Sequence, residues 1–88
     1  MEKKNLIIKL NTIQDVNDFV SMCNKYKGEY IDVKQGRQVI DGRSILGMYS
    51  LNHMKNLEVE VDGDDLNSVF EFYESIKKWQ VNANNKMK

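Results

Sequence analysis

The sequence is organised around residues 41–51, which read Asp-Gly-Arg-Ser-Ile-Leu-Gly-Met-Tyr-Ser-Leu. This stretch predicts the end of a strand, a sharp turn at Gly42, and a short helix that begins at Ser44. A serine at the start of a helix caps an unpaired backbone N–H with its hydroxyl oxygen. A phosphate on the same hydroxyl would face the positive end of the helix dipole. Ser44 is therefore either a plain helix cap or the site of a phosphorylation switch.

The apolar residues of this predicted helix indicate more than a capping role. The residues concerned are Ile45, Leu46, Met48, Tyr49 and Leu51. They are too many for the narrow buried stripe of a short helix, so we expect some of them to face water. Gly47 costs a helix about 1 kcal/mol in propensity, and its presence predicts a close approach to another backbone. The simpler alternative is that these side chains complete the core and that Ser44 only caps its helix.

Hydrophobic periodicity places the remaining elements. It predicts strands at 6–10, 30–34, 37–41 and 57–61, and helices at 13–27 and 64–76. Met1 to Asn5 is expected to be a charged lead-in, and Gly28 is expected to end the first helix. Thr12, with Asp15 three residues later, approximates a capping box. The buried stripe of the last helix is predicted to consist of Leu66, Val69, Phe70, Tyr73 and Ile76.

These elements define an α+β fold. Their order is strand, helix, strand, strand, short helix, strand, helix, which suits a four-stranded antiparallel sheet with three helices on one face. The other face is expected to be open to water. Leu57, Val59 and Val61 alternate with acidic residues, so one face of that strand is expected to be buried and the other wet and acidic. A ferredoxin-like sandwich, in which the Ser44 helix becomes a loop, is the nearest competitor.

Composition sets the class of protein. The 88 residues, of which 41% are apolar, suit one domain at 1–80 and a polar tail at 81–88, with fraying expected from Gln80 on. The 13 basic and 13 acidic residues cancel, so the chain lacks the excess of positive charge that is typical of nucleic-acid-binding proteins. No apolar run approaches the roughly 20 residues of a membrane span, and no signal sequence is evident. The single cysteine, Cys23, is expected to be an inert core residue. We therefore expect a cytoplasmic protein that binds neither nucleic acid nor membranes.

The stretch around Ser44 resembles the corresponding segment of HPr, the small phosphocarrier of the bacterial sugar phosphotransferase system. In that family a basic residue, a serine, two apolar residues, a glycine, two more residues and Ser-Leu follow one another. Here the same run extends from Arg43 to Leu51. The order and spacing of the predicted elements also fit HPr from about Leu6 onward. The resemblance implies the open-faced α+β sandwich of HPr, in agreement with the order of the elements.

The residues that carry phosphate in HPr have no counterpart here. In HPr the run Gly-Ile/Leu-His-Ala-Arg-Pro-Ala precedes the first helix, and its histidine takes the phosphoryl group. The matching residues 10–16 contain no histidine, arginine or proline, and Thr12 stands at the histidine position. Asp15 would also bring negative charge to the place where the phosphate should sit. The resemblance therefore implies a divergent HPr-like protein without the histidine-linked relay.

His53 is the only histidine of the chain, and it lies in the loop that follows the Ser44 helix. A lone loop histidine with no carboxylate or cysteine at ligand spacing is typical of a solvated surface residue. The sequence also contains no nucleophile beside a base, no metal-ligand cluster and no glycine-rich phosphate loop. It therefore predicts no enzymatic activity, no cofactor and no metal site.

The resemblance implies two candidate functions. In many Gram-positive bacteria a dedicated kinase phosphorylates the HPr serine, and the modified protein binds a transcription regulator that represses catabolic genes. The first expectation is a non-catalytic regulatory module, phosphorylated at Ser44, whose partner is HPr kinase or such a regulator. The alternative is an unorthodox phosphocarrier that uses His53. The expected partner-binding residues of this monomer or weak dimer are Arg43, Ile45, Leu46, Tyr49 and His53.

Overall fold

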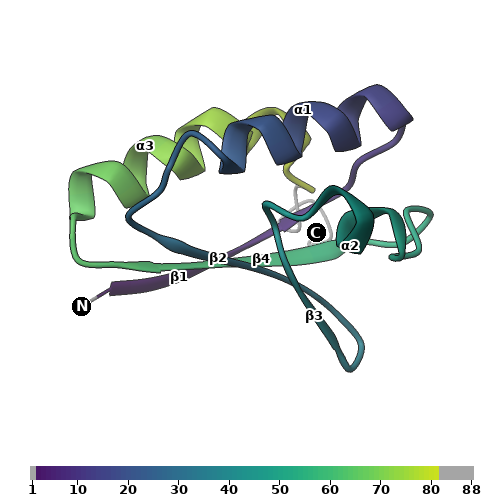
Figure 1. Cartoon of the computed structure of the whole chain (residues 1–88), viewed down its shortest axis with the longest axis horizontal. Helices are drawn as coiled ribbons and strands as arrows, with labels where there is room; N and C mark the ends of the chain where they lie inside the picture. Colours follow the sequence, from purple (N-terminus) through teal and green to yellow (C-terminus); the bar gives the residue numbers. More distant parts are fainter. Residues whose placement is uncertain (1, 82–88) are drawn as a thin grey trace, which may run out of the picture.

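The computed structural model describes residues 2–81, and it confirms the predicted α+β architecture. Within these residues the chain forms one four-stranded antiparallel sheet and three α-helices. The elements are β1 (Glu2–Ile8), α1 (Ile13–Cys23), β2 (Tyr30–Gln35), β3 (Gln38–Asp41), α2 (Ile45–Tyr49), β4 (Leu57–Gly63), α3 (Leu66–Ile76) and the 3-10 helix η1 (Lys77–Trp79). Figure 1 shows α1 and α3 side by side over one face of the sheet, with α2 near one end of it.

The strand order in the sheet is β1-β4-β2-β3. β4 pairs antiparallel with both β1 and β2, so that Val59 lies between Leu6 and Val33. The alternation predicted for β4 is confirmed, because Leu57, Val59 and Val61 are all fully buried. Its acidic face is less wet than predicted. Glu58, Glu60 and Asp62 are half-buried, and Glu60 forms an ion pair with Lys34.

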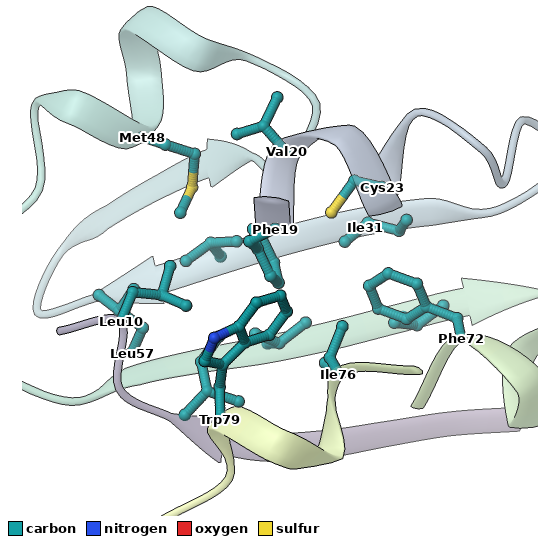
Figure 2. Close-up of a cluster of buried hydrophobic side chains, with 14 of the residues drawn as sticks. Leu10, Phe19, Val20, Cys23, Ile31, Met48, Leu57, Phe72, Ile76 and Trp79 are labelled. Atoms are coloured by element: carbon teal, nitrogen blue, oxygen red, sulfur yellow. The ribbon is translucent and has the colours of Figure 1, made fainter. Parts of the chain in front are cut away.

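The core lies between the sheet and the helices (Figure 2). Phe19 of α1 meets Phe72 of α3 edge to face, with their ring centroids 6.4 Å apart, and it meets Trp79 of η1 at 6.1 Å. Met48 of α2 enters the same cluster and is fully buried. Cys23 is also buried, as predicted, and burial raises the pKa of its thiol to about 12. Such a thiol stays protonated at neutral pH and is unreactive.

The buried stripe of α3 differs from the prediction. Val69, Tyr73 and Ile76 are buried, but Leu66 and Phe70 are 53% and 62% exposed. The residue that the prediction missed is Phe72, which is fully buried. Its ring packs against Phe19 and, at a centroid distance of 5.4 Å, against Tyr26. The helix is therefore rotated relative to the predicted stripe so that an aromatic cluster forms with α1 and the turn that follows it.

The first helix is shorter than predicted. α1 ends at Cys23 instead of Lys27, and Asn24 is its C-cap. In the turn after α1 the guanidinium group of Arg43 donates hydrogen bonds to two backbone carbonyl oxygens, Tyr26 O and, at 2.6 Å, Glu29 O. After Cys23 the backbone forms tighter turns, in which Lys25 N donates to Met22 O and Tyr26 N to Cys23 O, both at 3.1 Å. Arg43 holds the turn that follows, and Tyr26 still packs against the core.

Both ends of the described chain are more ordered than predicted. β1 begins at Glu2, inside the expected lead-in, because its backbone pairs with β4 as far as Gly63. At the other end Gln80 forms a β-bridge with Ile8, and Val81 N donates to Ile7 O at 2.8 Å. The rest of the predicted tail, 82–88, lies outside the described residues. Among the described residues, no helix has the length and apolar character needed to cross a membrane.

Truncation of the two phenylalanines of α3 tests its rotation. Phe72→Ala should lower the free energy of unfolding by about 3–5 kcal/mol, because it empties a fully buried position. Phe70→Ala, the matched exposed control, should cost about 1 kcal/mol or less. Urea denaturation followed by circular dichroism measures both values. Equal losses for the two variants would contradict this orientation of α3.

Candidate functional site

The site is built on α2, whose first turn is fixed by Ser44. The backbone of Ser44 is extended, with φ −93° and ψ 109°, and its Oγ accepts a hydrogen bond from Gly47 N at 3.1 Å. Ser44 is thus the N-cap, as predicted. It is also exposed, so its hydroxyl group faces solvent while it caps the helix.

Two glycines hold α2 close to the rest of the domain. A Cβ atom at Gly47 would lie 2.6 Å from Ile40 Cγ2, and a Cβ atom at Gly42 would lie 3.0 Å from both Cys23 Sγ and Ile31 Cγ2. The predicted close approach at Gly47 is therefore real, but the nearest contact is the Ile40 side chain of β3 and not a backbone. No larger residue fits at either position without a shift of its neighbours.

The apolar residues of α2 divide between the core and the surface, as predicted. Met48 and Leu51 are buried, whereas Ile45, Leu46 and Tyr49 are 36%, 77% and 44% exposed. We call these three exposed residues the α2 surface. Together they present a contiguous stretch of helix with apolar side chains facing water.

The α2 surface is anchored to α1 through its tyrosine. Tyr49 Oη donates to Asn17 Oδ1 at 2.6 Å, which fixes the ring between the two helices. Ile13, which is 65% exposed, lies one helical turn before Asn17 and on the same face of α1. Sequence reasoning missed Ile13 as a surface residue. The available signal was that this apolar side chain comes before the buried positions of its helix, which begin at Val16.

Arg43 has a structural role that the sequence did not reveal. In addition to its two bonds to the turn after α1, its Nη1 lies 3.7 Å from Asp41 Oδ1. The same carboxylate oxygen accepts a hydrogen bond from Arg43 N at 2.9 Å. The guanidinium group thus joins the segment before Ser44 to the turn that follows α1. Partner binding by Arg43 stays a prediction.

Thr12 caps α1 in the same way that Ser44 caps α2. Its Oγ1 accepts a hydrogen bond from Asp15 N at 3.0 Å, and Asp15 Oδ2 accepts one from Asn11 N at 3.2 Å. Burial opposes ionisation of this carboxyl group. Hydrogen bonds from the Trp79 side chain, Asn11 and Thr12 outweigh burial and lower the pKa of Asp15. The start of α1 therefore carries a stable negative charge.

His53 is not the solvated residue that was predicted. It is half-buried, and its Nε2 lies 2.6 Å from Met48 O. Because a carbonyl oxygen only accepts, Nε2 carries the proton and donates it. Nδ1 is buried and has no hydrogen-bond partner among the described residues. The ring thus supports the loop after α2. Within residues 2–81 no group of histidine, cysteine or acidic side chains has the arrangement needed to hold a metal ion.

A larger side chain at Gly47 tests the close contact between α2 and Ile40 of β3. Gly47→Ala should lower stability by about 1–3 kcal/mol despite the better helix propensity of alanine, because the added methyl group meets Ile40. Combination with Ile40→Ala should make the two losses less than additive, by about 0.5 kcal/mol or more. Gly28→Ala is the control, since nothing lies within 4 Å of its Cβ position. Strictly additive losses in urea denaturation would contradict the contact.

The pH dependence of stability tests the cap of α1. A lowered pKa means that ionised Asp15 stabilises the fold above about pH 4, the pKa of an unfolded aspartate. That contribution is lost as the pH falls through the lower folded-state pKa. Asp15→Asn should therefore reduce the thermal midpoint by a few degrees at neutral pH, and the difference from the unchanged chain should shrink in acid. Asp18→Asn, at an exposed position of α1, should change little at either pH.

Comparison with known proteins identifies the fold. No protein-family model matches the chain, and no curated protein matches it in sequence. Twelve chains of solved structures do match. One is the crystal structure of HPr-C-His from Thermoanaerobacter tengcongensis, with a TM-score of 0.66 and 22% sequence identity. The match covers 89% of this chain and 93% of that one. The chain therefore has the HPr-like fold.

Proposed function

We propose that this chain is a non-catalytic relative of the phosphotransferase-system carrier HPr that acts by binding a protein partner through the α2 surface. The relation to that system rests on the shared fold and on the run from Arg43 to Leu51. The observation that carries the docking role is the exposure of Ile45, Leu46 and Tyr49 on one short, firmly held helix. A rigid apolar surface loses little conformational entropy when a partner covers it.

The geometry of the candidate phosphate acceptors supports a role without phosphotransfer. An imidazole that accepts a phosphoryl group must present a nitrogen lone pair to the donor. In His53, Nε2 is committed to Met48 O and Nδ1 is buried. At the start of α1, Thr12 is committed to capping and Asp15 carries negative charge. Neither position favours a phosphocarrier, which was the alternative function.

Ser44 is the proposed point of regulation. A phosphate there adds nearly two negative charges beside the α2 surface. The serine is exposed, and Met48 and Leu51 remain buried in the core, so the change acts on docking and leaves the fold in place. HPr kinase or a transcription regulator is the proposed class of partner.

Phosphorylation by HPr kinase and ATP tests this function. Intact-mass spectrometry should show one added phosphate on the unchanged chain and on Ser50→Ala, but none on Ser44→Ala. Leu46→Asp should slow the reaction by roughly tenfold or more, since it places a charge in the docking surface. Phe70→Asp should not slow it, because it makes the same change at an exposed apolar residue of α3.

Two outcomes would contradict the proposal. One is the absence of phosphate on the chain under conditions in which HPr itself is modified. The other is acid-labile phosphate on His53 after incubation with phosphoenolpyruvate and the first enzyme of the phosphotransferase system. Because Ser44→Ala loses a helix cap worth about 1 kcal/mol, circular dichroism of each variant checks that it is folded.

A further inference from the structure

A second candidate site lies at the other end of the domain. An open cavity of about 440 Å³ is lined by the turn 25–29, which joins α1 to β2, and by the first residues of α3 with the two that precede them. In Figure 1 both segments lie at the left end of the sheet, whereas α2 lies at the right. The volume is within the range of about 300–1,000 Å³ that is typical of small-molecule sites.

Glu29 is the most unusual residue of this cavity. It lines the cavity, yet it is only 6% exposed. Its side chain packs on Gly63, where a Cβ atom would lie 2.8 Å from Glu29 Cγ. Among residues 5–81 no side chain or backbone N–H within bonding distance donates to its carboxylate, and the carboxylate oxygens themselves are not fully buried. The stem of Glu29 is therefore packed in place, whereas its carboxylate has no internal partner and is open to a ligand in the cavity.

The remaining lining favours a positively charged partner. Acidic residues outnumber basic ones there: the acidic residues are Glu29, Asp64, Asp65 and Glu71, and the basic ones are Lys25 and Lys27. Asp65 is the N-cap of α3 and accepts from Asn67 N at 3.0 Å. Neither lysine forms an ion pair within the part of the chain that the structure describes. Among residues 5–81 the carboxylate groups of Glu29, Asp64 and Glu71 accept no hydrogen bond and form no ion pair, so they are available to a ligand.

The geometry of the carboxylates selects the kind of cation. No set of three acidic or other ligating side chains among the described residues converges as a metal ion requires. An alkylammonium group needs less, because it donates up to three separate hydrogen bonds and pairs with carboxylates as a point charge. We propose that this cavity binds an aliphatic amine whose ammonium group pairs with Glu29. The proposal goes beyond docking at α2 and does not depend on it.

Titration with 1,4-diaminobutane, followed through the backbone amide signals of the full chain, tests the site. We expect saturable shifts confined to 25–29 and 64–71, and none with 1,4-butanediol, which has the same length but no charge. Glu29→Gln should weaken binding by roughly tenfold, the factor that one charge-assisted hydrogen bond supplies. Glu74→Gln is the matched control. It makes the same change on α3 at a residue that pairs with Lys77 and lies outside the cavity.

A second variant guards against a folding defect at a buried position. Glu71→Gln, at an exposed residue of the cavity, should also weaken binding. A blocked tripeptide with a central lysine distinguishes the source of the ammonium group, because tighter binding of the peptide would assign it to a protein partner. Equal weakening by Glu29→Gln and Glu74→Gln, equal shifts with the diol, or no saturation by about 10 mM amine would overturn the proposal.

Discussion

The burial of one face of β4 is the interaction on which the rest of the structure depends. Leu57, Val59 and Val61 are fully buried, and each such side chain contributes about 1.5–3 kcal/mol relative to an exposed one. The strand order places β4 between β1 and the β2–β3 hairpin, so it joins the start of the chain to its middle. The helices α1 and α3 cover the face that these residues present. This row forms the centre of the apolar surface on which the helices pack, and Ile8 of β1 and Ile31 and Val33 of β2 extend it on either side.

The sheet was predictable from the sequence, whereas parts of the helices were not. The strict alternation of β4 allows only one choice of buried face, since a shift by one residue would bury Glu58 and Glu60. The apolar residues of α3 permit two overlapping stripes, one with Phe70 and one with Phe72. The choice between them depends on Phe19 and Tyr26, which lie far away in the sequence. Local periodicity carries no information about such distant partners.

Arg43 shows how one distant contact changes what a local pattern means. Tyr26 continues the apolar spacing of α1 and still packs on the core, but the backbone there is a turn whose carbonyl group Arg43 binds together with that of Glu29. A basic residue before Ser44 was visible in the sequence, whereas its target was not. The capping of α2 by Ser44 was predictable, because a cap is made within one turn. The buried ring of His53 was not, since its position depends on the fold of the whole loop.

Local and distant contacts together determine which side chains are exposed at the two ends of the domain. At one end the Ser44 cap, the contact of Gly47 with Ile40 and the Tyr49–Asn17 hydrogen bond hold α2 firmly, so its exposed apolar side chains belong to a rigid element. At the other end the turn 25–29 lines an acidic cavity in which Glu29 is packed in place. The fold thus carries an apolar surface at one end and an acidic cavity at the other. Arg43 links the two, because it lies next to the α2 cap in the sequence and its side chain bonds to the backbone of the cavity turn.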